Sequence, residues 1–392
     1  MTVQTAQADT AAATAARAPL RAKPLLLYPF ATPPAPGETL EVAPGVLWVR
    51  MTLPLALDHI NLYLLEDQDG WWVVDTGMRG RTTQASWESV FAAPALRGKP
   101  IKAIICTHCH PDHIGQAGWI SERWRAPLWM SAAEYYMGRV FCTSSSDGPI
   151  WEARDFYAKA GAPAEFLERI GKGSAGFSAM VEPMPRSFHR LAQGDHLLIN
   201  GMRWEAVIGR GHSPEHLCLF QPETGILLSG DQVIPLITSN VSVMAIEPEA
   251  DPLADWLESH RRFLRDLPDD VLVLPAHNTP FRGLHARLHY LIEHHEHHLL
   301  ALEAACVEPC TAVELLPVIF RRALGPEQLG LALGELIAHL HHLRTQGLLH
   351  RQDGDDGLHR YVAADPLRAA RLRDGLGPDD DDVLMDLEGQ PV

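Results

Sequence analysis

Two groups of short apolar runs, separated by turn-forming residues, occupy most of the chain up to about residue 275, and runs of this length predict β-strands. The first group comprises Leu47–Leu53, Ile60–Leu65, Trp71–Val74 and Ile101–Cys106. Asp67-Gln68-Asp69-Gly70 is a hairpin signal between the second and third runs. Thr82–Leu96 has helical composition and stops before Gly98 and Pro100. This alternation of strand and helix predicts an α/β layer around a mixed sheet.

The second group of apolar runs predicts hairpins. It comprises Leu197–Ile199, Met202–Ile208, His216–Phe220, Ile226–Leu228 and Val271–Leu274, with a predicted helix at Pro252–Asp266. Asn200-Gly201 joins the first two runs, and Asn-Gly between apolar runs is the strongest short hairpin signal. Pro222-Glu223-Thr224-Gly225 marks a second hairpin turn.

Between the two groups, residues 132–190 have helical composition and form an insertion rich in aromatic and methionine side chains. These are Tyr135, Tyr136, Phe141, Trp151, Phe156, Tyr157, Phe166, Phe177, Met180 and Met184. One interpretation is a partly mobile apolar wall over a binding site, suited to an acyl chain or another apolar group. The other is simple core packing of extra helices.

Beyond Phe281 the apolar pattern changes to that of longer helices. His285–Val307 is one helical run crowded with histidines, of which His294 and His298 stand at i and i+4. Two histidines at this spacing can bind a metal, but the run lacks the H-E-x-x-H pattern. We therefore favour a solvated, titratable helix face.

Two amphipathic helices and two short strands follow. The helices are predicted at Thr311–Leu324 and Pro326–Gly347, and the strands lie within Leu348–Val362, around the acidic turn Asp353-Gly354-Asp355-Asp356-Gly357. The second helix carries Glu327 and Glu335 but only Arg344 as a fixed cation. A surface of this charge should repel phosphate.

The composition is that of a soluble protein, with 46% apolar and 21% charged residues among 392. No apolar stretch approaches the roughly 20 residues needed to span a membrane. Six cysteines are a low number for a chain of this length, which predicts reduced thiols and a cytoplasmic protein. The net charge of −16 argues against a nucleic acid as the main partner.

The strongest chemical signal is Thr107–Gly115, directly after the apolar run ending at Cys106. Its metal-ligand side chains are His108, His110, Asp112 and His113. His108 and His110 lie two residues apart on an extended segment and share a face, whereas Cys109 points to the opposite face for packing. Pro111 suits the first turn of a helix running through Ile114–Trp124, so Asp112 and His113 lie at the helix start.

Three further ligand-type residues each follow a short β-rich run and precede a turn. They are His212, Asp231 and His277. Together with H-x-H-x-D-H and Asp75 in Val74-Asp75-Thr76-Gly77, this set resembles the metallo-β-lactamase superfamily over roughly residues 40 to 284. The resemblance implies an α/β fold, the four-layer αββα sandwich of that superfamily.

The resemblance also implies two metal sites. His108, His110 and His212 would hold one metal, Asp112, His113 and His277 would hold the second, and Asp231 would bridge both. Asp75 is expected to hold a metal-binding histidine by its other ring nitrogen, unless it is only a helix or turn cap. Two Zn²⁺ fit this histidine-rich donor set, although iron or manganese would occupy the same ligands.

The activity implied is that of a dinuclear metal-dependent hydrolase, in which a bridging hydroxide attacks a carbonyl, because metal binding lowers the pKa of water to about 7. Asp112 and Asp231 would be the catalytic carboxylates. Asp231, where class B1 β-lactamases use Cys, argues against a β-lactamase. His110, where the diiron flavoproteins carry a carboxylate, argues against oxygen reduction. The ligands thus resemble those of the glyoxalase II and lactonase branches, with a small, partly apolar thioester, ester or lactone as substrate.

Candidate substrate-contacting residues come from three places. His59 and Asn61 share a face of a strand, Tyr135 and Trp151 belong to the aromatic insertion, and Ser239 and Asn240 lie in the loop Leu236–Val241.

Two other functions are open. Some members of the superfamily that carry a winged-helix module cut RNA, so an endoribonuclease is one alternative, and a non-catalytic binding protein is the other. The two helices and two strands predicted over residues 311–362 resemble the small winged-helix module found C-terminal to some metallo-β-lactamase hydrolases. Their acidic charge leads us to interpret this winged-helix-like module as a structural or substrate-bordering lid, or as a homo-oligomer contact.

The expected organisation has four parts. Residues 1–36 form a disordered or extended arm, 37–284 the metallo-β-lactamase domain with its 132–190 insertion, 285–364 the winged-helix-like domain and 365–392 a disordered acidic tail.

Overall fold

The structure is a computed structural model, which describes residues 24–54, 57–143, 151–171, 176–321, 324–325 and 328–375. Most of the predicted N-terminal arm, the far part of the acidic tail and Glu327 lie outside the described residues.

The first group of apolar runs forms a seven-stranded sheet in which spatial order follows chain order. Its strands are β1 (Thr39–Ala43), β2 (Val46–Thr52), β3 (His59–Glu66), β4 (Trp71–Val74), β5 (Ile101–Ile105), β6 (Leu128–Met130) and β7 (His189–Arg190). Strands β1 to β4 pair antiparallel, and β4 to β7 pair parallel. Parallel pairing brings the carboxyl ends of β4 and β5 to the same edge, and the residues just after them meet there.

The second group forms a five-stranded sheet with the order β12-β11-β10-β9-β8. Its strands are β8 (His196–Ile199), β9 (Met202–Gly209), β10 (His216–Gln221), β11 (Ile226–Gly230) and β12 (Leu272–Pro275). The predicted Asn200-Gly201 hairpin turn is confirmed, because both residues have the positive φ angles, 51° and 76°, that a tight two-residue turn requires.

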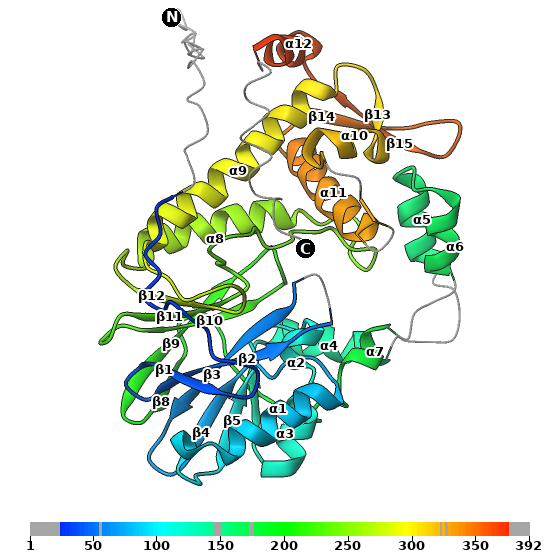
Figure 1. Ribbon diagram of the computed structural model, residues 1–392. Coiled ribbons are helices and arrows are strands. Elements are labelled where there is room, and N and C mark those ends of the chain that lie inside the picture. Colours follow the sequence, from blue (N-terminus) through cyan, green and yellow to red (C-terminus); the bar gives the residue numbers. More distant parts are fainter. Residues whose placement is uncertain are drawn as a thin grey trace, which may run out of the picture.

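The two sheets pack face to face and are covered by helices on both outer sides, which confirms the four-layer αββα sandwich (Figure 1). Trp48 and Trp204 are buried between the sheets. The outer face of the first sheet packs against α1 (Arg81–Ala92) and α3 (Ala117–Trp124). That of the second packs against α8 (Pro252–Asp266) and α9 (Leu284–Ala305).

The insertion is helical and divides between two cores. Its helices are α4 (Ala132–Thr143), α5 (Trp151–Lys159), α6 (Ala164–Gly171) and α7 (Gly176–Met180). Tyr135 of α4 packs into the core of the first sheet, whereas Phe166 of α6 packs with the C-terminal helices. Much of the aromatic content is therefore core packing, and α5 and α6 lie beside the C-terminal elements (Figure 1).

The C-terminal part is a small helical unit with a three-stranded sheet of order β13-β15-β14. Its elements are β13 (Cys310–Thr311), α10 (Ala312–Ile319), α11 (Leu329–Thr345), β14 (Leu349–Asp353), β15 (His359–Ala363) and α12 (Pro366–Gly375). The first half of α9 packs on the five-stranded sheet, and its second half packs with α10 and α11. The expected boundary at residue 285 therefore lies at the start of a helix that both parts share. None of the helices in the described part of the chain is both long enough and apolar enough to cross a bilayer.

Two expectations for this region were wrong. The chain directly beyond Asp365 is not a disordered tail, because α12 buries Ala369 and pairs Arg368 with Glu303. The histidine-rich face of α9 is not solvated either. His294, His295 and His298 are 5%, 0% and 5% exposed. They are buried because α11 covers that face, a tertiary contact that the local sequence of α9 does not encode.

Arg287 of α9 holds the loop that follows Asp231 in the chain. It is 1% exposed, and its guanidinium donates to the carbonyl oxygens of Ile234 and Ile237, each at 2.7 Å. Burial lowers its pKa to about 10, so it remains charged at neutral pH.

Replacing Arg287 with Ala should lower the free energy of unfolding by about 3 kcal/mol, because one buried and one partly buried carbonyl lose a charged donor. Arg265→Ala, at an exposed position of α8, should change it by less than about 0.5 kcal/mol. Urea denaturation measures both values, and equal effects would show that Arg287 does not hold the loop.

Candidate metal centre

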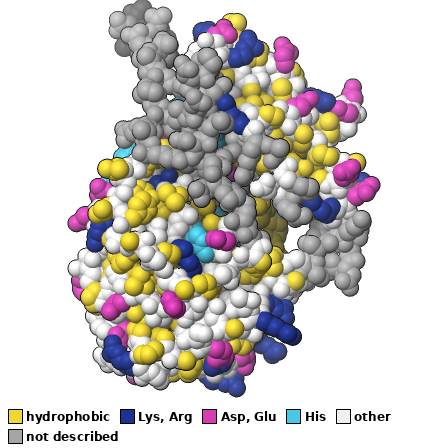
Figure 2. Space-filling view, viewed as in Figure 1, with side chains coloured by type: hydrophobic (Ala, Val, Ile, Leu, Met, Phe, Trp, Pro, Cys, Tyr) yellow, Lys and Arg dark blue, Asp and Glu magenta, His cyan; other side chains and the backbone are white. Residues whose placement is uncertain are grey.

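The predicted ligands converge at one edge of the sandwich, each on a turn directly after a strand or at a helix start. His108 and His110 follow β5, His212 follows β9, Asp231 follows β11 and His277 follows β12. Figure 2 shows histidine side chains beside an acidic one in a hollow on this face of the molecule.

The helix that carries Asp112 and His113 differs from the prediction. It begins at Pro111 and ends at Ile114 as α2 (Pro111–Ile114), and the chain turns before α3 begins at Ala117. Gly115 permits this turn, since a Cβ there would lie 2.4 Å from the carbonyl oxygen of Pro111 and 2.5 Å from that of Gly77. The short helix start still presents both side chains to the site.

One ligand group consists of His108, His110, His212 and Asp231. The Nε2 atom of His108 lies 2.8 Å from Nδ1 of His110 and 3.2 Å from Nε2 of His212. The Nε2 atom of His212 lies 3.4 Å from Oδ2 of Asp231.

The other group consists of Asp112, His113 and His277. The Nε2 atom of His277 lies 3.5 Å from Oδ2 of Asp112 and 3.4 Å from Oδ1 of Asp231. The Nε2 atom of His113 lies 3.6 Å and 3.5 Å from the same two oxygens. Asp231 therefore stands between the groups, with Oδ2 toward the first and Oδ1 toward the second.

These spacings fit divalent metal ions. Ligand atoms at 2.0–2.1 Å from a tetrahedral zinc are about 3.3 Å apart, close to most of the separations above. The buried Nε2 of His113 and Oδ1 of Asp231 have no hydrogen-bond partner in the described part of the chain. Buried polar atoms without a partner are destabilising, and a cation would satisfy both.

Protonation also favours ligation. Burial holds the pKa of His108 and of His110 well below the usual range, so both rings are neutral and keep a lone pair for a metal. Burial also acts to lower the pKa of His113, but the carboxylates of Asp112, Asp75 and Asp231 outweigh it and raise that pKa. The three carboxylates therefore make the binding of positive charge at the centre favourable.

Three ligand histidines are oriented through their outward ring nitrogen. Nδ1 of His113 lies 2.8 Å from Asp75, as expected for that carboxylate. Nδ1 of His212 lies 2.8 Å from the carbonyl oxygen of Asn240, and Nδ1 of His277 lies 2.9 Å from that of His59. Donation of each Nδ1–H to oxygen leaves Nε2 as the lone-pair nitrogen facing the centre.

Four of the residues predicted to contact substrate make hydrogen bonds that support the metal centre. The backbone of His59 holds His277, and the Asn61 side chain, 1% exposed, donates to the carbonyl oxygens of Pro275 and Asn278. The Ser239 hydroxyl donates to the carbonyl oxygen of Asp231, and Asn240 orients His212.

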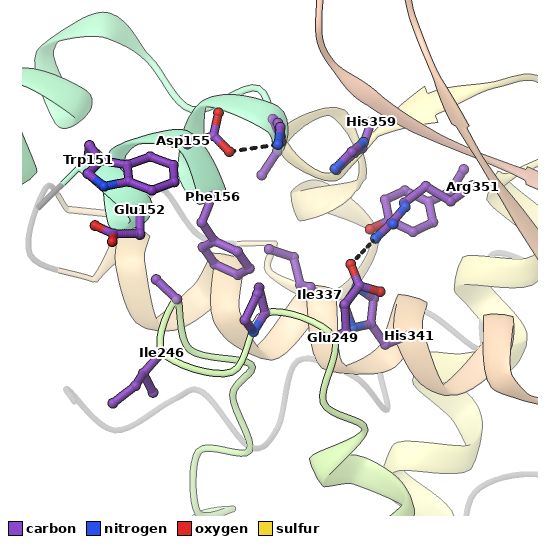
Figure 3. A pocket seen from close by; sticks show the side chains of 15 residues that line it. Trp151, Glu152, Asp155, Phe156, Ile246, Glu249, Ile337, His341, Arg351 and His359 are labelled. Atoms are coloured by element: carbon purple, nitrogen blue, oxygen red, sulfur yellow. Dashed lines mark hydrogen bonds and ion pairs between the residues drawn. The ribbon is translucent and has the colours of Figure 1, made fainter. Parts of the chain in front are cut away.

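The other two candidates do not join the centre. The Tyr135 ring stacks on Phe188, and its hydroxyl donates to the carbonyl oxygen of Pro185. Trp151 lines a separate cavity of about 410 Å³ between α5, the loop Ala245–Glu249, α11 and the strands β14 and β15 (Figure 3). None of the predicted ligands lines this cavity.

Sequence reasoning missed two supporting residues. Nε2 of His216 accepts a hydrogen bond from the Asp231 amide at 3.0 Å. The buried Glu134 carboxylate accepts the amides of Cys109 and Glu215, at 3.0 and 2.8 Å, and so ties the two ligand loops together. The repeated histidine in Gly211-His212-Ser213-Pro214-Glu215-His216 was a signal for the first, whereas no local pattern marks Glu134.

Comparison with known proteins agrees with this geometry. The family model for the metallo-beta-lactamase superfamily matches residues 55–277, and that for the metallo-beta-lactamase-like C-terminal domain matches residues 299–364. The chain therefore belongs to the metallo-beta-lactamase superfamily and carries its C-terminal domain.

Three similar proteins illustrate the relationship. A beta-lactamase domain protein from Burkholderia ambifaria is 42% identical, with a TM-score of 0.80 over 86% of this chain and 98% of that one. A metallo-beta-lactamase family protein from Thermus thermophilus is 28% identical, with a TM-score of 0.70 over 82% of this chain and 100% of that one. The probable metallo-hydrolase YqjP of Bacillus subtilis (strain 168) is 22% identical over 77% of this chain and 92% of its own.

Replacing Asp75 with Asn should weaken metal binding about 10- to 100-fold, because the amide no longer fixes the tautomer of His113. Asn accepts the left-handed backbone at this position, where φ is 61°, so the fold should persist. Competition with a chromophoric chelator measures the affinity, with the exposed Asp69→Asn as control. Unchanged affinity in Asp75→Asn would reduce Asp75 to a turn cap.

Proposed function

We propose that this protein is a dinuclear metal-dependent hydrolase of a small, partly apolar thioester, ester or lactone, with two Zn²⁺ as the resident ions. The observation that carries the proposal is the position of Asp231, whose two oxygens face two separate ligand groups. A pair of divalent ions there supplies polarisation of a carbonyl and a water deprotonated near neutral pH.

The two carboxylates, Asp231 and Asp112, have different roles in the proposed reaction. The Asp231 carboxylate keeps the two ligand groups in register, and His216 fixes its backbone. The Asp112 side chain is 17% exposed, against 10% for that of Asp231, and is the carboxylate that a substrate and its water reach more easily. Asp112 is suited to take a proton from the attacking water and return it to the departing thiolate or alkoxide.

The substrate class rests on the superfamily and on the cavity beside α5. Trp151, Phe156, Ile246 and Ile337 give that cavity apolar walls, and Arg351 in it pairs with Glu249 at 2.8 Å (Figure 3). Two segments connect it to the metal centre. The first is the loop that contains Asn240, whose carbonyl oxygen lies 2.8 Å from Nδ1 of His212, and this loop reaches the cavity at Ile246. The second is α11, whose Glu335 accepts a hydrogen bond from the Asn240 side chain and whose Ile337 lines the cavity. The apolar part of a substrate would lie toward these walls.

In the C-terminal unit two helices, α10 and α11, are followed by two strands, β14 and β15. We propose that this unit is a winged-helix-like module that borders the substrate rather than binding nucleic acid. Its wing is acidic, Arg360 is paired with Asp356, and Arg351 with Glu249. These ion pairs leave few cations among its described residues to neutralise phosphates. A ribonuclease activity would need a basic path to the centre.

Removing the metal by chelation should abolish hydrolysis of acyl thioesters, and two equivalents of Zn²⁺ per chain should restore it. A panel of thioesters, lactones and single-stranded RNA, assayed with the loaded protein, distinguishes the candidates. Cleavage of RNA without thioester or lactone turnover would replace the proposal with the ribonuclease, and a protein that purifies metal-free and inert would indicate a binding protein.

Trp151→Ala should raise the KM for a long-chain acyl thioester about fivefold to tenfold while leaving that for the acetyl thioester unchanged, because only the long chain reaches the aromatic wall. Leu198→Ala, at another exposed apolar position, should change neither. Equal KM values for both substrates in Trp151→Ala would separate the cavity from substrate binding.

A further inference from the structure

A second cluster of imidazoles lies between α9 and α11, outside the metal centre. His295 and His298 come from α9, and His339 comes from α11. They are 0%, 5% and 0% exposed. The ring centroid of His339 lies 5.2 Å from that of His295 and 5.5 Å from that of His298. Figure 1 shows the two helices side by side.

The hydrogen bonds within this cluster do not satisfy all of its ring nitrogens. Nδ1 of His339 donates to the carbonyl oxygen of Glu335 at 2.8 Å, which leaves its Nε2 as the lone-pair nitrogen. That Nε2 lies 3.1 Å from Nδ1 of His295. Nε2 of His295 and Nδ1 of His298 are buried without a hydrogen-bond partner among the described residues. A buried polar nitrogen without a partner is unfavourable, and a bound cation would satisfy both of these nitrogens.

The three side chains also have the protonation state that ligation needs. Burial holds the pKa of His295 and of His298 well below the usual range and lowers that of His339 to about 4. Neutral imidazole is the form that offers a lone pair to a metal, whereas three protonated rings would repel one another.

We propose that His295, His298 and His339 form a third metal site, which binds one divalent transition ion of the zinc class and joins α9 to α11. One ring nitrogen of each residue lies within 4.8 Å of those of the other two. Imidazole ligands without a carboxylate favour zinc, copper or nickel over magnesium or calcium. Three histidines leave a fourth position for water.

The role of this site is structural. Helix α9 packs on the sandwich and on the C-terminal unit, so an ion held by α9 and α11 would fix the two parts together. Glu335, which accepts from His339 through its carbonyl, also accepts from Asn240 through its carboxylate, and Asn240 orients His212. The third ion would thereby steady a residue that positions a ligand of the main centre.

The test counts bound zinc in the full chain by mass spectrometry after removal of loosely held metal. His298→Gln should contain one equivalent of zinc less than His289→Gln, a control at an exposed position of the same helix. Zinc added to the metal-free chain should raise the melting temperature less in His298→Gln than in His289→Gln. Equal zinc content in the two variants would overturn the proposal.

A second measurement covers a failure of His298→Gln to fold. The double variant His110→Ala/His277→Ala lacks ligands of both groups at the main centre and leaves the α9–α11 cluster intact. One equivalent of zinc bound to it, with a zinc-dependent rise in melting temperature, supports the third site if both are lost when His339→Gln is added, because ligands that remain at the main centre are unchanged by that substitution. Absence of bound zinc shows that the cluster is metal-free packing. The readout is independent of hydrolysis, so failure here leaves the proposed function untouched, and loss of thioester hydrolysis leaves this site untouched.

Discussion

The position of the Asp231 carboxylate is the constraint on which the rest of the site depends. Each of its oxygens faces a different group of histidines, and it is buried where an uncompensated charge would be costly. Burial acts to raise its pKa, but the neighbouring His277 and His113 overcome this and lower the pKa well below the usual range. The carboxylate therefore stays ionised and draws positive charge to the space between the two groups.

Strands from both sheets end at the edge of the sandwich where this carboxylate lies. The ligands come from turns after β5, β9, β11 and β12, and each turn is held by contacts outside the ligand set. Glu134 ties the turn of His110 to that of His212 through two amides, and Arg287 holds the loop after Asp231. Rigid supports of this kind keep ligand atoms within the narrow range of distances that a metal accepts.

Local signals in the sequence predicted the strands, the hairpin turns and a mixed α/β layer, whereas the four-layer sandwich and the two groups of ligands were implied by the resemblance to the superfamily, which itself rests on short motifs. Strand periodicity, the Asn200-Gly201 turn and the H-x-H-x-D-H spacing are each readable within a few residues. Asp75 was placed correctly beside a histidine for the same reason.

Features that depend on tertiary contacts were missed or misread. The histidines of α9 appeared to be a solvated face because nothing in residues 285–307 reveals that α11 covers them. His59, Asn61, Ser239 and Asn240 were predicted to contact substrate, and their supporting contacts at the centre were missed, because proximity to a ligand in sequence does not reveal such contacts.

The most direct test of the bridging role of Asp231 is a crystal structure of the zinc-loaded protein with anomalous data at the zinc edge. The bridging role predicts two ions about 3.5–4 Å apart, with one oxygen of Asp231 bound to each. A single ion at this centre, or two ions with Asp231 bound to neither, would contradict it.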